Sequence, residues 1–270
     1  MNAAVTELVC YPVKGCAGLS LRSARMTFRG IEHDREFMIV DEDLSFRSQR
    51  RDPVLALIRP TIDVDGLTLH YPDAGSVTCP IDKASSSCDV TMFGRPFRGI
   101  DQGDDVASFL SEVIGEKSRL VAVPEDFHRV TDGIAPGTAG FADSSAVHIL
   151  SKSTLDGLNS RLDTALPMNR FRPNIVVDGW DSPHTEDLVR SVAIGDTELT
   201  YTKLAIRCPV TTVDQSLGRR DGREPLATLA TYRTARQKGV AFGSKFTVIR
   251  GGTVTVGDDI TVASWGDTEL

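Results

Sequence analysis

Short apolar stretches separated by Gly and Pro most constrain how this chain folds. Residues 1–100 alternate between strand-like runs and turn signals, with no long helical period among them. The clearest case is the pair Thr61–Val64 and Leu67–Tyr71, which flanks Asp65-Gly66, a strong hairpin signal. Short strands at this spacing predict a small barrel or an open sheet.

The other strands predicted in this region are also short and apolar: Val5–Val13, Leu19–Phe28, Glu36–Val40, Ser45–Arg47 and Val54–Ile58. The segment Asp104–Ile114 differs, because its apolar residues recur at helical spacing and Gly115 follows them. Leu120–Val123 then predicts one more strand. Residues 125–140 are rich in Pro, Gly and Asp, which indicates a linker or mobile loop.

Two further helices are predicted in the second half of the chain. One covers residues 153–162 with Ser151 or Ser153 as its N-cap, and the other covers 224–235 with Pro225 in its first turn. The strands expected around them are Ile175–Val177, Val192–Ile194, Glu198–Ile206, Phe246–Val248 and Gly252–Val262. The sequence therefore predicts a mostly β fold with a few helices, of the α+β class. We place the domains at residues 1–122 and 123–265, with a tail at 266–270.

The charge balance excludes some partners. The 270 residues carry 30 Lys and Arg against 37 Asp and Glu, a net charge of −7. A chain this acidic is not built to coat nucleic acid or an anionic membrane, although a basic pocket can still be focused inside it. We find neither a secretory signal nor an apolar run of about 18 residues. We therefore expect a cytoplasmic protein with no membrane span.

Five cysteines, an odd number, indicate reduced thiols. Cys79 and Cys88 could face each other across a hairpin, but zinc-type spacing is absent. Cys208 has the neighbours best arranged for chemistry. Pro209 biases it toward extended backbone, and Arg207 favours the thiolate. Taken alone, this stretch favours a buried, inert thiol, and a cysteine hydrolase with a remote His also stays open.

Three basic stretches add candidate anion-binding groups. Lys14-Gly15 predicts a turn, which could hold a phosphate or be an ordinary surface turn. Arg35 precedes an apolar strand, where it could recognise an anion or pair with a neighbouring carboxylate. Arg172 and Asn174 lie just before the strand at 175–177 and offer a bidentate cation and an amide. Arg219, Arg220 and Arg223 instead indicate a solvated charge run.

The ordered set of motifs resembles the two-domain MOSC proteins. The motifs are YPVKGC at 11–16, Asp34-Arg35 before a strand, FRPN at 171–174, RCPVTTVD at 207–214 and GVAFGSKFTVIRGGTVTVGDDI at 239–260. The resemblance covers about residues 3–262. It implies an N-terminal MOSC β-barrel-like domain packed on a MOSC β-barrel.

The relatives that this resemblance suggests are the mitochondrial amidoxime-reducing component and its bacterial counterparts, which bind a molybdenum cofactor. It would make Cys208 the catalytic residue and the protein ligand to molybdenum. The cofactor is a molybdopterin, a pyranopterin dithiolene with a terminal phosphate. The other cofactor-binding residues that the resemblance implies come from both domains: Lys14, Gly15, Arg35, Ser144, Ser145, Arg172, Asn174, Arg207, Thr211, Thr212 and Asp214.

The resemblance also implies an activity, the reduction of N-hydroxylated compounds by oxygen-atom transfer. No iron–sulfur cysteine pattern occurs in this chain, so we expect a separate electron-donor protein of flavin reductase, ferredoxin or cytochrome type. Two departures are Gly15, where relatives often have Ser, and the lack of a membrane-targeting N-terminus. Two alternatives stay open: a cofactor sulfurtransferase with a Cys208 persulfide, and a non-catalytic protein that binds and carries the cofactor.

Overall fold

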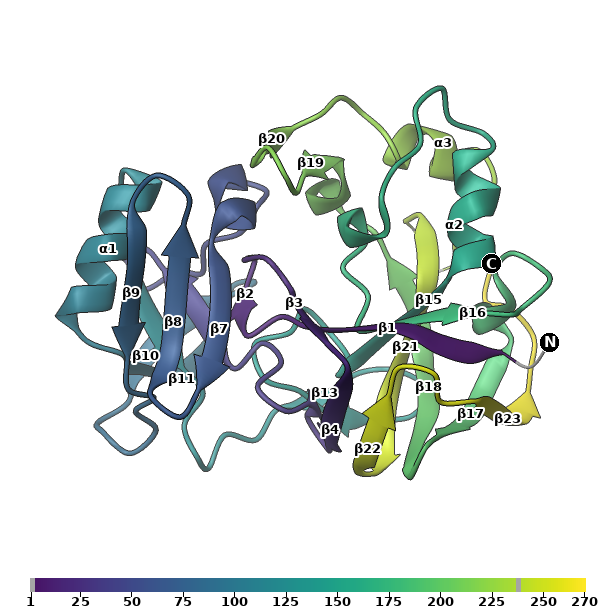
Figure 1. Cartoon of the computed structure of the whole chain (residues 1–270), viewed down its shortest axis with the longest axis horizontal. Helices are drawn as coiled ribbons and strands as arrows, with labels where there is room; N and C mark the ends of the chain where they lie inside the picture. The colour runs from purple at the N-terminus through teal and green to yellow at the C-terminus, as the bar shows by residue number, and fades with distance from the viewer. Residues whose placement is uncertain (1–2, 237–238) are drawn as a thin grey trace.

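The computed structural model describes residues 3–236 and 239–270, and most of its regular structure is β-strand. Two regions lie side by side in Figure 1, and we call them the first and second modules. Three α-helices occur in the described part of the chain, one on the first module and two on the second. The expected mostly β fold class is confirmed.

The first module contains two sheets and one helix. Helix α1 (Asp104–Ile114) has the predicted bounds and ends at Gly115, whose φ of 80° needs no Cβ. Its buried Leu110 packs with Phe37 and Leu120 in one apolar core. The five-stranded sheet has the order β10 (Cys88–Met92), β11 (Arg95–Asp101), β12 (Arg119–Ala122), β6 (Phe37–Val40) and β2 (Val13–Lys14). The three-stranded sheet consists of β7 (Arg59–Asp63), β8 (Gly66–Tyr71) and β9 (Gly75–Cys79).

The second module is built on an eight-stranded sheet. Helix α2 (Lys152–Asn159) connects two parallel neighbours in this sheet, β15 and β16, and Ser151 Oγ accepts a hydrogen bond from Thr154 N at its start. Helix α3 (Leu226–Ala230) lies near α2 in Figure 1. The strand order is β23 (Ile260–Trp265), β17 (Val189–Ile194), β18 (Thr197–Ile206), β21 (Ala241–Arg250), β15 (Val147–Ser151), β16 (Ile175–Asp178), β1 (Ala4–Cys10) and β3 (Leu19–Leu21).

The start of the chain belongs to the sheet of the second module. Strand β1 pairs antiparallel with β16, with Leu8 opposite Ile175, and runs across that module in Figure 1. Strand β4 (Ser23–Thr27) likewise pairs with β22 (Gly252–Thr255) and with β5 (Gly30–Ile31). Because β1 ends in one module and β2 lies in the other, the segment between Cys10 and Val13 crosses the junction. The domain division at 122 stays a prediction.

Several predicted elements differ from the structure. Residues 53–57 form a 3₁₀ helix, η1 (Pro53–Leu57), in place of a strand, because Pro53 starts the turn without an N–H to donate. The third helix is shorter than predicted, since Arg233 leaves it to donate to Asp187 and Ala241 O inside the module. The last predicted strand is split by a turn at Gly257 into β22 and β23. Ser45–Arg47 contributes only isolated bridges.

The remaining elements are short connectors. Residues 125–140 contain a small hairpin of β13 (Val130–Thr131) and β14 (Gly137–Thr138). Strands β19 (Val213–Asp214) and β20 (Arg219–Arg220) pair beside the 3₁₀ helix η4 (Pro209–Thr212). Two other 3₁₀ helices are η2 (Met168–Arg170) and η3 (Thr185–Asp187). Among the described residues, none of the helices has the length and apolar character needed to cross a membrane.

Candidate functional site

A cavity of about 480 Å³ lies between the modules and takes its lining from both. It collects most of the residues predicted as cofactor-binding. Those that line it are Lys14, Gly15, Arg35, Ser144, Ser145, Arg172, Arg207 and Cys208. The other predicted residues, Asn174, Thr211, Thr212 and Asp214, do not line it.

Cys208 supplies a thiol to this cavity. It follows the end of β18, has extended backbone (φ −122°, ψ 174°) and precedes the turn that Pro209 begins. Its carbonyl accepts hydrogen bonds from Thr211 N and Oγ1, and these bonds fix the backbone of Cys208 against the turn that follows. Cys208 is half-buried and free. Cys10, Cys16 and Cys79 are buried elsewhere, Cys88 is half-buried on β10, and burial raises the pKa of each of these four thiols.

Three cations of the second module face the cavity with no carboxylate partner within the described ranges. Arg207 Nη2 donates to Phe171 O at 2.7 Å, while its buried Nε has no hydrogen-bond partner. Arg172 Nη1 reaches only Gln215 Oε1, at 3.4 Å. Lys245 Nζ has no hydrogen bond to any described residue, and burial beside Arg35 and Arg207 lowers its pKa to about 7. We call Arg172, Arg207 and Lys245 the unpaired wall.

Two cations of the opposite side, Lys14 and Arg35, are neutralised within the protein, whereas Arg50 also lines the cavity and forms no ion pair with any described residue. Lys14 is 6% exposed, donates to Phe141 O at 2.9 Å and pairs with Asp143. That ion pair holds the pKa of Asp143 well below its ordinary value. Arg35 pairs with Asp34. We call Lys14–Asp143 and Arg35–Asp34 the paired wall.

Tyr11 separates two of the arginines. The guanidinium carbon of Arg35 lies 4.4 Å from the centroid of its ring, and that of Arg172 lies 4.2 Å from the same centroid. Such stacking places two like charges near each other with an aromatic ring between them. Both arginines have positive φ, 49° and 55°, a strained conformation for a residue with a side chain. The fold therefore fixes these two side chains at a backbone cost.

Asn174 acts behind the cavity. Its Oδ1 accepts from Arg35 Nη1 at 3.1 Å and from His148 N, and its Nδ2 donates to Asp34 Oδ1 at 2.9 Å. All of its side-chain capacity is used by these contacts and by Val9 O. Asn174 therefore positions Arg35 and Asp34 and has no group left for the cavity.

The other predicted residues outside the cavity are used by their own turns. Thr211 Oγ1 donates to Cys208 O and Thr212 Oγ1 donates to Pro209 O, so both hydroxyls stabilise η4. Asp214 accepts from Arg170 Nη2 at 3.1 Å and from the backbone of the turn that follows. Ser145 lines the cavity, but its hydroxyl is bonded to Thr202 at 2.6 Å. Arg219, Arg220 and Arg223 are exposed, as expected.

Sequence reasoning missed Asp143 and Lys245. The sequence around Lys245 could have identified it, since it is the one charged residue in a run of apolar or small residues from Ala241 to Val248. Asp143 carried no such signal, because its partner Lys14 lies 129 residues away. Gln49 was also missed: it donates to Gly15 O at 2.6 Å and exchanges hydrogen bonds with Gln215, which joins the two modules beside the cavity.

Comparison with known proteins gives two family matches that divide the cavity between them. The MOSC N-terminal beta barrel domain matches residues 2–117, and the MOSC domain matches residues 136–261. Mitochondrial amidoxime reducing component 2 of Rattus norvegicus is 32% identical over 95% of this chain and 82% of that protein. The chain belongs to the MOSC family.

Other relatives agree with this assignment. Mitochondrial amidoxime reducing component 2 of Bos taurus is 33% identical, and mitochondrial amidoxime-reducing component 1 of Homo sapiens is 32% identical. Each match covers 95% of this chain and 82% of the relative. The resemblance expected from the motifs is confirmed. In this MOSC protein, the first matched segment supplies Lys14 and Arg35 to the cavity, and the second supplies Arg172, Arg207 and Cys208.

Proposed function

We propose that this MOSC protein is a molybdenum-cofactor-dependent oxidoreductase that reduces N-hydroxylated compounds. The observation that carries the proposal is a cysteine thiol sharing one cavity with cations that have no carboxylate partner among the described residues, the unpaired wall and Arg50. A thiolate suits a soft metal site, and arginine suits a phosphate. The names of the relatives, amidoxime-reducing components, favour this substrate class.

The residues present fit such a cofactor. A volume of about 480 Å³ lies in the range of ordinary small-molecule sites. Cys208 Sγ would hold the metal, and the unpaired wall would hold the phosphate and other anionic groups. The buried Arg207 Nε without a partner is the kind of group that a bound anion satisfies. We propose Lys14, Gly15 and Arg35 as support for the same ligand from the first module.

The protein itself would orient the substrate and manage protons. When bound, the cofactor supplies two-electron oxygen-atom transfer, and the reduction of an N–O bond also consumes two protons and releases water. Lys245 lines the cavity and, with its pKa lowered to about 7, holds an exchangeable proton there near neutral pH. The aromatic side chains of Phe46 and Phe93 line the same cavity and give it apolar surface.

We further propose that electrons come from a separate flavin reductase, ferredoxin or cytochrome-type protein. We also propose a reducing compartment, the cytoplasm, as the place of action. All five cysteines are free thiols, which supports this choice.

Elemental analysis tests the proposal. Protein expressed in a host that makes the cofactor should contain about one molybdenum per chain. Cys208→Ser should lower N-hydroxylated substrate reduction by more than about 100-fold, a loss larger than that for changing a residue behind a metal ligand. Cys88→Ser, which removes a half-buried thiol that does not line the cavity, is the matched control.

Other outcomes identify the alternatives. Molybdenum-free protein with a persulfide on Cys208, detected by mass spectrometry, would replace the proposal with sulfur transfer. Tight cofactor binding without reduction, given a competent electron donor, would replace it with a carrier role.

A further inference from the structure

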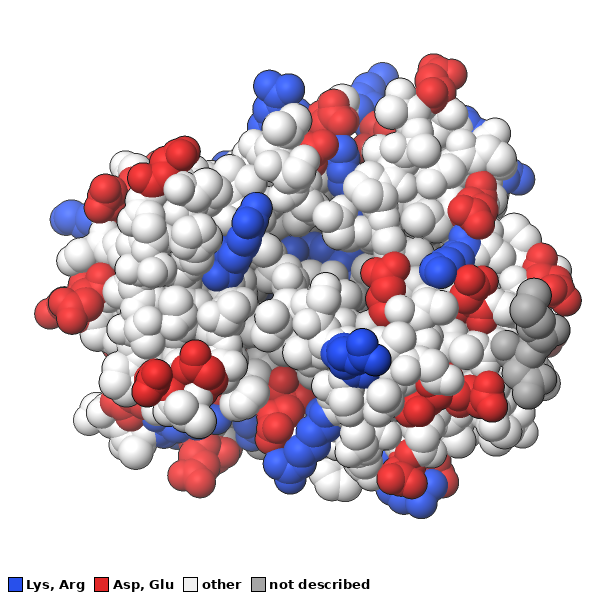
Figure 2. Space-filling view, viewed as in Figure 1, with Lys and Arg blue, Asp and Glu red and all other residues white. Residues whose placement is uncertain are grey.

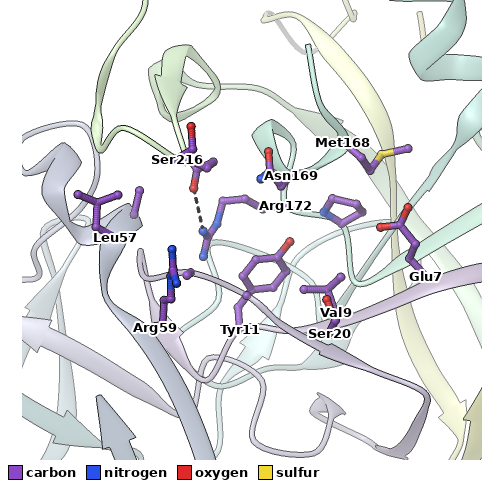
Figure 3. Close-up of a pocket in the computed structure, with 15 residues that line it drawn as sticks. Glu7, Val9, Tyr11, Ser20, Leu57, Arg59, Met168, Asn169, Arg172 and Ser216 are labelled. Atoms are coloured by element: carbon purple, nitrogen blue, oxygen red, sulfur yellow. Dashed lines mark hydrogen bonds between the residues drawn. The ribbon is translucent and has the colours of Figure 1, made fainter. Parts of the chain in front are cut away.

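A second cavity of about 320 Å³ also lies between the modules and shares Arg172 with the first. Figure 2 shows a hollow on this face with Lys or Arg atoms at its base. In Figure 3 the side chains of Leu57 and Arg59 enter it from one side, and those of Met168 and Asn169 enter from another. Tyr11 and Arg172 lie between them.

Two arginines and a phenol are among the polar groups of this second cavity. Tyr11 is 3% exposed, yet its hydroxyl has no hydrogen-bond partner within residues 3–236 and 239–270. Arg59 is exposed and forms no ion pair with any described residue. Arg172 reaches only Gln215 Oε1, the bond that Figure 3 marks with a dashed line. Two arginines and a phenol thus line the same cavity, and neither arginine is paired with a carboxylate of the described residues.

Carboxylates are nearly absent from this lining. Glu7 is the one carboxylate in the lining, and Figure 3 shows it at the end away from Arg59, beyond Val9 and Ser20. Apolar surface from Val9, Leu57 and Met168 separates the two ends. The cavity therefore offers an oxyanion site beside an apolar floor.

We propose that the second cavity binds a small organic anion, with its oxyanion on Arg59, Arg172 and the Tyr11 hydroxyl and its apolar body against Val9, Leu57 and Met168. The chemistry is that of a carboxylate or a phosphate ester. Charge-assisted hydrogen bonds from arginine would supply most of the binding free energy. The proposal rests on the lining of the second cavity and does not rest on the proposed function of the first.

The shared Arg172 has a consequence for the two cavities. Its guanidinium stacks on the Tyr11 ring and contributes to both linings. An anion in one cavity screens the charge that the other cavity uses. By thermodynamic linkage, each ligand lowers the affinity for the other by the same factor.

Calorimetric titration of the 270-residue protein without added cofactor, with benzoate and with phenyl phosphate, tests the proposal. At least one probe should bind at a single site, and the stronger one identifies the oxyanion. Arg59→Gln should weaken that binding by about tenfold or more, because a hydrogen bond between charged groups is lost. Tyr11→Phe, which keeps the ring between the arginines, should weaken it by about threefold to tenfold.

Two control variants decide where the probe binds. Arg22→Gln removes an exposed arginine outside the lining of the second cavity and should leave the affinity unchanged. Lys245→Gln changes the first cavity alone. A probe whose affinity falls with Lys245→Gln but not with Arg59→Gln occupies the first cavity and overturns the proposal. Absence of binding by both probes to the unmodified protein also overturns it.

Discussion

The two walls of the first cavity contain similar residues but differ in the charge available to a ligand. In the paired wall, Lys14 and Arg35 each contact a carboxylate of the protein. In the unpaired wall, Arg172, Arg207 and Lys245 contact carbonyl or amide oxygens or no described acceptor at all. Burial lowers the pKa of all three residues of the unpaired wall.

This difference shows that a basic motif does not by itself identify an anion site. Lys14-Gly15 and Arg207-Cys208 are equally basic in sequence, but Lys14 is already satisfied by Phe141 O and Asp143. A buried charge without a partner costs free energy, which a bound anion recovers. The unpaired wall should therefore dominate ligand affinity.

The largest expected effect comes from changing one residue in each wall. Arg207→Gln should weaken retention of the cofactor by about 10- to 100-fold, since it removes charged hydrogen bonds that no protein carboxylate shares. Lys14→Gln should weaken it less, because Asp143 already neutralises the Lys14 charge. The measurement is the cofactor dissociation rate, followed by molybdenum per chain during dialysis. A larger effect for Lys14→Gln would reverse the ranking of the walls.

The next effect is a pH dependence that belongs to the unpaired wall. The pKa of Lys245 is lowered to about 7, so its ammonium is present below that pH and is lost above it. Anion affinity of cofactor-free protein should therefore fall by up to about tenfold between pH 6 and pH 8. Sulfate is the appropriate probe, because its own charge is constant over this range.

Lys245→Gln should remove that pH dependence and leave the affinity at the level that the unmodified protein shows at pH 8. Lys203→Gln is the matched control, because Lys203 also lines the cavity but is paired with Asp132 at 2.6 Å. An unchanged pH profile in the Lys245 variant would assign the titration to another group.

Much of the fold followed from local patterns. The helix Asp104–Ile114 was predicted with its observed bounds, because apolar spacing, acidic first-turn residues and Gly115 all agree. The pairing of β1 with β16 could not be predicted, since the partners are about 170 residues apart. Only tertiary structure shows that the start of the chain completes the sheet of the second module.

Some residues of the candidate site also followed from local sequence, and others did not. Cys208 was found because Pro209 marks extended backbone at the end of a strand, and Arg172 was found because it lies with Asn174 just before a predicted strand. Asn174 was grouped with the arginines as a cofactor-binding residue, and its bonds to Arg35 and Asp34 place it behind the cavity. Asp143 could not be predicted from local sequence, because the carboxylate that neutralises Lys14 comes from a loop in the other half of the chain.

A smaller effect tests the paired wall through stability. Asp143→Asn removes the carboxylate while leaving Phe141 O on Lys14. It should lower the free energy of unfolding by about 1–2 kcal/mol, because Lys14 is buried but the Asp143 side chain is 56% exposed. Urea denaturation at pH 7 measures the change. Asp132→Asn, which breaks a more exposed ion pair with Lys203, is the control and should cost less.

The smallest effect concerns why glycine occupies position 15 of the paired wall. Gly15 has φ +84°, and a Cβ there would meet Leu55 Cδ1 at 3.2 Å. Gly75 has φ +77° with open space around it. Both Gly→Ala variants should lose about 1 kcal/mol from the left-handed backbone, and Gly15→Ala should lose slightly more from crowding. If Gly15→Ala also leaves cofactor retention unchanged, the glycine serves the turn. Loss of retention at unchanged stability would mean that the ligand approaches the backbone at Gly15. The paired wall would then support cofactor binding by its shape, although its charges are already neutralised.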